Sequence, residues 1–227
     1  MIKPEPTVGL PGDPLYEVVY GSHAHGTATP TSDVDVRGVY MLPSNDFLGL
    51  GRPKTTWENK AEDRVFWELG HFVQLLLKGN PNLVGLLYAP DDCVLYTTLI
   101  ANDLRLMRDC FLSQTFRKAY MGWIAREAKD LAAMHKGHAK RLSHLPRLIW
   151  ELESVYRTGT MVVRPDLGKR GFIVDIKTGD MDYDEAFAWV GDAILDLEKL
   201  DAEIGPSLPE PPTEMMNDWL LTWRRYR

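Results

Sequence analysis

Two aspartates, Asp33 and Asp35, stand two residues apart at the start of an apolar run that extends from 34 to 42. If that run forms a β-strand, both side chains project from the same face, because side chains alternate along a strand. Two carboxylates held that close require a cation between them or a proton on one of them. The spacing therefore predicts a divalent-metal site.

A polar loop precedes the two aspartates. It is rich in Gly, Ser and Thr, and it joins the run at 34–42 to a short β-prone run at 16–20. Gly21 allows a sharp backbone turn, and backbone N–H groups after such a turn, together with the Ser22 hydroxyl, are suited to binding phosphate. The sequence thus predicts a metal site beside a phosphate-binding loop.

The composition is that of a soluble globular protein. Of its residues, 44% are hydrophobic and 26% are charged. The length of 227 residues suits one domain, or a small domain with a helical extension. The net charge of −6 argues against a broad nucleic-acid-binding surface but allows a local basic patch. Cys93 and Cys110 have no metal-ligand spacing, which favours a reducing compartment. With no membrane-length apolar run and no signal peptide at 1–13, we expect a cytoplasmic protein.

The order of elements predicts an α+β fold. We expect a small mixed β-sheet with flanking helices over residues 1–88, then an α-helical region over 89–227, with the boundary near 89–92. Pro146 should distort the helix that contains it, and 160–174 should be irregular. The expected strands lie at 16–20, 34–42, 55–58 and 62–68, and the expected helices at 69–78, 82–88, 97–110, 113–139, 138–159, 182–204 and 214–227.

The loop and its aspartates resemble a known signature. Gly-Ser, a short loop and then Ser-Asp-Val-Asp is similar to the signature of the DNA polymerase β superfamily of nucleotidyltransferases. The run over 21–40 resembles a narrower group, the predicted nucleotidyltransferases of the RNA-repair-pathway polymerase-β-like family. Two later blocks continue the likeness in the same order: the strand and Lys-Gly-Asn-Pro helix end over 63–81, and Lys-x3-His-x2-Arg-Leu over 140–148. The resemblance extends from Tyr16 to about Leu200.

This resemblance implies a nucleotidyltransferase core and its reaction. An acceptor hydroxyl attacks the α-phosphorus of a nucleoside triphosphate (NTP), pyrophosphate leaves, and Mg²⁺ or Mn²⁺ neutralises charge. By resemblance, Asp33 and Asp35 are catalytic metal ligands. A further carboxylate is expected from a neighbouring strand, and Asp63 is favoured as catalytic and metal-binding because it matches the acidic residue that opens the family's strand. Glu68 is the alternative.

The resemblance also implies contacts to the nucleotide or the acceptor. A structural role for Arg37, as the ion-pair partner of Asp35 or Asp33, is an equal alternative. His23 and His25 depart from the family pattern, which has Arg and an aromatic residue there, and we expect both to face solvent or phosphate. Gly70-His71 replaces a basic pair. The residues assigned to the nucleotide are Gly21, Ser22, Arg37, Lys78, Lys140 and Arg147.

The acceptor is left open by these residues: an RNA end, a protein or a small molecule. Two other functions compete with the leading one. The first is a small-molecule nucleotidyltransferase of the antibiotic-modifying kind. The second is a catalytically silent nucleotide-binding or antitoxin-like module, which the lack of a further catalytic carboxylate would favour.

Overall fold

The computed structural model describes residues 4–48, 50–134 and 138–225. Within them lies a five-stranded mixed sheet with the order β3-β4-β2-β1-β5. Only β2 and β4 run parallel to each other; the other neighbouring strands are antiparallel. The strands are β1 (Asp13–Val19), β2 (Val36–Met41), β3 (Thr56–Asn59), β4 (Arg64–Glu68) and β5 (Val94–Thr97).

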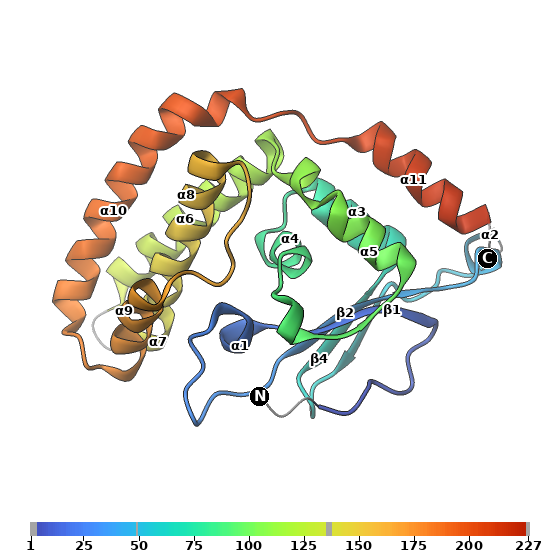
Figure 1. Cartoon of the computed structure of the whole chain (residues 1–227), viewed down its shortest axis with the longest axis horizontal. Helices are drawn as coiled ribbons and strands as arrows, with labels where there is room; N and C mark the ends of the chain where they lie inside the picture. Colours follow the sequence, from blue (N-terminus) through green and yellow to red (C-terminus); the bar gives the residue numbers. More distant parts are fainter. Residues whose placement is uncertain (1–3, 49, 135–137, 226–227) are drawn as a thin grey trace.

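Helices cover one face of this sheet and continue into a helical C-terminal region, which confirms the predicted fold class (Figure 1). α10 runs along the outside of α8, and α11 returns to pack against α3. The helices are α1 (Gly21–His25), α2 (Asn45–Leu48), α3 (Leu69–Leu77), α4 (Pro81–Leu87), α5 (Leu99–Leu106), α6 (Gln114–Ala133), α7 (Ala139–Leu142), α8 (His144–Thr158), α9 (Leu167–Thr178), α10 (Tyr183–Ile204) and α11 (Thr213–Arg225).

Three features of the sheet half differ from the prediction. β2 begins at Val36, so Asp33 and Asp35 lie just before the strand rather than on it. The polar loop contains the short helix α1, which ends at Gly26 in the left-handed conformation. The strand β5 was missed; its four residues are too few to show an alternating pattern, and the fold places them against β1.

The helical half differs in two places as well. The expected helix over 138–159 is divided into α7 and α8, which meet at Ser143. Pro146 lies in the first turn of α8, where no helical partner is lost because the N–H groups of that turn have none. Part of the segment expected to be irregular forms α9, whose N-terminus is capped by the Asp166 side chain on the Lys169 N–H.

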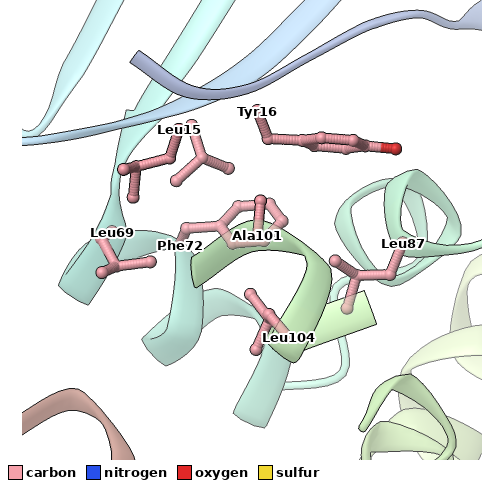
Figure 2. A pocket seen from close by; sticks show the side chains of 8 residues that line it. Leu15, Tyr16, Leu69, Phe72, Leu87, Ala101 and Leu104 are labelled. Atoms are coloured by element: carbon pink, nitrogen blue, oxygen red, sulfur yellow. The ribbon is translucent and has the colours of Figure 1, made fainter. Parts of the chain in front are cut away.

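One continuous apolar core extends from β1 through α8 to Met216 in α11. It is tightly packed: between β1, α3 and α5 only a cavity of about 10 Å³ remains, and its walls are apolar (Figure 2). A space of that size holds at most one water molecule, and apolar walls offer it no partner. β5 lies beyond residue 88 yet pairs with β1, so the division of the chain at that residue stays a proposal.

The described residues contain no helix that is both long and apolar enough to span a membrane.

Candidate active site

Asp35 and Asp63 are brought together by the parallel pairing of β2 and β4. Val36 is paired with Arg64, so the residue before each strand stands at the same edge of the sheet. The Val36 N–H donates to the Asp63 carbonyl at 3.0 Å and fixes this register. Asp63 adopts a left-handed conformation with φ of 48°, which aspartate tolerates better than most residues.

Arg37 joins the two carboxylates. Its Nη2 lies 3.1 Å from Asp35 Oδ1 and 3.0 Å from Asp63 Oδ1, and its Nη1 donates to the Asp63 carbonyl at 2.7 Å. Because Arg37 and Asp35 are two residues apart, their side chains leave the chain on the same face. The pairing of Arg37 with Asp35, expected as one alternative, is therefore present and extends to Asp63.

The carboxylates of Asp35 and Asp63 interact strongly. Partial burial, then the hydrogen bond with Asp63, raises the pKa of Asp35 to about 6, although Arg37 opposes the shift. The same hydrogen bond lowers the pKa of Asp63. A carboxyl that is hard to ionise beside a second carboxylate marks a place where added positive charge is favourable.

Gly21 lies directly against Asp35. The Tyr20 N–H donates to the Asp35 carbonyl at 2.8 Å, which ties the end of β1 to the start of β2. Gly21 follows with φ of 57°, and a Cβ atom there would collide with Asp35 Oδ2. Only glycine fits both the conformation and the space. Ser22 is half-buried on α1, and its carbonyl accepts from the Thr27 N–H at 2.8 Å.

The helix α1 is held by the segment that follows α8. Arg164 donates from Nε to the Ala24 carbonyl at 3.0 Å and from Nη2 to the His23 carbonyl at 3.3 Å, and so adds a charged donor to two carbonyls at the helix end. Its Nη1 also pairs with Asp92 at 2.9 Å. Arg164 therefore fixes the position of the loop that begins at Gly21.

His25 is buried, contrary to the expectation that it faces solvent or phosphate. Its Nδ1 lies 3.1 Å from the Val163 carbonyl, which accepts a hydrogen bond, so that nitrogen carries the proton. Burial, followed by the positive charge of Arg147, lowers the pKa of His25 well below its usual range. His25 thus anchors α1 to the helical half as a neutral side chain.

Arg147 belongs to the same buried cluster. It donates from Nη1 to Glu151 Oε1 at 3.0 Å, while Tyr120 donates its hydroxyl to Glu151 at 2.7 Å. Glu151 Oε1 also lies 3.4 Å from the Nδ1 of His25. The predicted nucleotide contact Arg147 is therefore engaged with Glu151 behind the loop, whereas Lys140 is exposed on α7.

The remaining predicted residues occupy different places. Asp33 is exposed and next to the pair, and its charge contributes to the raised pKa of Asp35. Glu68 is buried at the other end of β4, where it accepts from the Gly70 N–H at 2.8 Å and pairs with Arg224. Lys78 is exposed at the end of α3 and has no described contact with the carboxylate pair. The described side chains form no group of three or more metal-ligating residues.

Three residues around the loop were not predicted as part of the site: Glu151, Arg164 and Lys177. Lys177, on α9, donates to the Thr27 carbonyl at 3.3 Å and to Ser32 Oγ at 3.0 Å. No local motif marks them, because each acts on a loop more than a hundred residues earlier in the chain. Only the folded arrangement reveals them.

The relatives found by sequence comparison are themselves uncharacterized. The chain is 29% identical over 122 residues to a 38.9 kDa protein of Enterobacteria phage T4, 31% over 139 residues to a protein of Methanocaldococcus jannaschii, and 26% over 152 residues to protein YcgL of Bacillus subtilis. These alignments cover 48%, 58% and 65% of the chain but only 36%, 49% and 58% of the respective relatives. No solved structure is detectably similar.

A family comparison is more decisive. Residues 11–169 match the RNA repair pathway DNA polymerase beta family, RlaP. This range contains Gly21, the pair of Asp35 and Asp63, and Arg37, and it makes up more than half of the chain. The family that the loop motif indicated is thereby confirmed: the protein belongs to the RNA repair pathway DNA polymerase beta family.

Proposed function

We propose that the protein is a metal-dependent nucleotidyltransferase that moves a nucleoside monophosphate from an NTP to a hydroxyl acceptor with release of pyrophosphate. The observation that carries the proposal is the convergence of Asp35 and Asp63 beside Gly21, at one edge of the sheet. Family membership supports it independently. A solvent-exposed sheet edge without a function would be expected to show neither the convergent carboxylates nor the match to the family.

The donor set fits Mg²⁺ or Mn²⁺. Asp35 and Asp63 offer hard oxygen ligands, and the raised pKa of Asp35 reflects like charge that a divalent cation would neutralise. Asp33 is exposed and adjacent, so we assign it as the other ligand of the set. When bound, the cation supplies Lewis-acid polarisation of the phosphate oxygens.

The chain's own residues supply positioning and proton transfer. Gly21 and Ser22 hold phosphate oxygens through backbone N–H groups and a hydroxyl. Asp63 orients the acceptor hydroxyl and takes its proton, because its lowered pKa keeps it ionised. Arg37 holds Asp35 and Asp63 at their separation. We assign this proton-accepting role to Asp63 and not to Glu68, which lies at the far end of β4 and is occupied by Arg224.

RNA is the acceptor that the family description favours. The net charge of −6 requires that any RNA contact be confined to a local basic surface. A protein hydroxyl or a small molecule remains compatible with the same chemistry, and the assay must therefore separate these acceptors.

The test is transfer of label from α-labelled NTPs in the presence of Mg²⁺ or Mn²⁺, with and without RNA. We expect label on RNA, and a loss of about 100-fold or more in Asp35→Asn. Asp46→Asn, which changes an exposed carboxylate on α2, is the matched control and should retain activity. Label on the protein itself would identify a protein acceptor. NTP binding without any transfer would overturn the enzymatic proposal and support a silent nucleotide-binding module.

A further inference from the structure

Two lysines of the helical region lie beside the loop that leads to Asp33. α7, which carries Lys140, packs against α9, which carries Lys177 (Figure 1). The ammonium group of Lys177 contacts the loop at both ends, 3.3 Å from the Thr27 carbonyl and 3.0 Å from Ser32 Oγ. Ser32 immediately precedes Asp33, so Lys177 brings positive charge next to the proposed metal ligands.

Neither lysine takes part in a described ion pair. Both hydrogen bonds of Lys177 go to neutral oxygens. Burial, and then repulsion from Lys140, lowers the pKa of Lys177, while Asp33 acts in the opposite direction. Two like charges that are kept close without a counter-ion favour an anion from solution.

His144 is the first residue of α8 and follows α7 with only Ser143 between them, which places it near Lys140. The residue is exposed, so solvent reaches it. Nevertheless, surrounding protein and then the positive charge of Arg147 lower its pKa to about 4. Lys140 and Lys177 act in the same direction, and Glu127 on α6 opposes them.

We propose that Lys140, Lys177 and His144 form a binding site for a phosphate group of the substrate, next to the loop over 26–33. The site rests on the proposed nucleotidyl transfer for its role, but its existence is measurable without that reaction. Lys177 lies outside the residues that match the family, so its assignment comes from the contacts of this chain, whereas Lys140 was already expected near the nucleotide from the resemblance.

The chemistry of these side chains suits phosphate. Two ammonium groups attract its charge, a neutral imidazole donates one hydrogen bond, and the Ser32 hydroxyl adds a polar group at the edge. Lysine binds phosphate as a point charge and needs no fixed planar geometry. The phosphate has two possible sources, the triphosphate of the nucleotide and the terminal phosphate of an RNA end, and different probes distinguish them.

The experiment measures binding by calorimetry without metal, using the full chain. One arm uses inorganic tripolyphosphate, and the other compares an oligoribonucleotide with and without a terminal phosphate. We expect Lys140→Met and Lys177→Met each to weaken binding of the recognised probe by about tenfold. Lys177→Arg keeps the charge and should bind within a few-fold of the wild type. Lys118→Met, which removes an exposed lysine of α6, is the matched control and should bind normally.

A second measurement reports on the surroundings of His144. By NMR, the bound probe should raise the pKa of His144, because an anion stabilises the charged imidazole. In Lys177→Met the pKa of His144 should already be higher before ligand is added, since one neighbouring cation is gone. If Lys177 only holds the loop in place, the pKa of His144 should not change when the probe is added.

These readouts separate failure of the site from failure of the reaction. Asp35→Asn should abolish transfer but keep lysine-dependent binding of the probe. If transfer is absent from the wild type while this binding persists, the proposed reaction fails and the phosphate site stands. Binding that is equal in the wild type, Lys140→Met and Lys177→Met, or absent for both probes, overturns the site. Lys140 is exposed, so Lys140→Met should remain folded. If Lys177→Met fails to fold, binding by Lys140→Met tests the site.

Discussion

Arg37 is one cation placed between two carboxylates of different character. Asp35 is partly buried and hard to ionise, whereas half of the Asp63 side chain is exposed and its pKa is lowered. Arg37 also binds the Asp63 backbone carbonyl, so it fixes the main chain and the side chain of that residue together. This explains how a residue in an unfavourable backbone conformation stays beside Asp35. It also makes Asp63 the better-placed carboxylate for the acceptor.

Paired substitutions at this scale separate Asp63 from Glu68. Asp63→Asn should lower kcat by about 100-fold or more and leave the free energy of unfolding within about 1 kcal/mol, because its side chain is half exposed. Glu68→Gln should do the reverse. It removes the charge that pairs with Arg224 in a buried place and should cost roughly 2–3 kcal/mol of stability while kcat of the folded protein is retained. The measurements are urea denaturation and the transfer assay at low temperature.

If Glu68→Gln lowered kcat as strongly as Asp63→Asn in fully folded protein, the assignment of the roles would be reversed. Equal and small effects on kcat would mean that neither side chain accepts the proton. Arg157→Met gives a baseline for loss of a surface pair, because Arg157 is 62% exposed and pairs along its own helix with Glu153.

At the scale of elements, α1 depends on contacts from distant parts of the chain. Five residues are too few to form a stable helix alone, and this one has no side-chain cap at its N-terminus. Arg164 and the hydrogen bond between His25 and the Val163 carbonyl supply the missing restraint. The position of Gly21 relative to Asp35 is thus set partly by the segment after α8.

Removing this restraint should affect nucleotide binding more than chemistry. Arg164→Met should raise KM for the NTP by about tenfold with a smaller change in kcat, and should cost roughly 1–2 kcal/mol of stability because two helix-end carbonyls lose a charged donor. Steady-state kinetics with a thermal unfolding control make the measurement. An unchanged KM in Arg164→Met would show that α1 holds its position without this side chain.

The sequence was informative about elements wherever a local signal was strong. The strands β2 and β4 and the helix α10 agree with the predicted ranges 34–42, 62–68 and 182–204, although the pairing of the two strands was not predicted. α9 was not predicted, because Gly168 and Gly171 weaken its helical pattern near its start. Asp35 and Asp63 were placed together through family resemblance; the bridge by Arg37 was one of two alternatives.

The parts of the site that were not predicted depend on how the whole molecule packs. The burial of His25 and the contacts of Lys177 require that α8 and α9 lie against the loop, and neither residue's neighbours in sequence indicate this. Sequence spacing describes periodic elements well, but a contact between residues 150 positions apart depends on how the completed helices pack. The loop is therefore a joint product of the sheet half and the helical half.

This joint construction predicts that the two halves unfold together. Leu148 on α8 is fully buried in the core that also contains Val18 of β1. Leu148→Ala should therefore lower the free energy of unfolding by about 2–5 kcal/mol, through lost apolar contact and the cavity left behind. If the core is one cooperative unit, amide hydrogen exchange in β1 should accelerate by the same free energy as exchange in α8, although β1 is not mutated. Unchanged protection of β1 in the variant would instead establish two independently unfolding units with a division near residue 88.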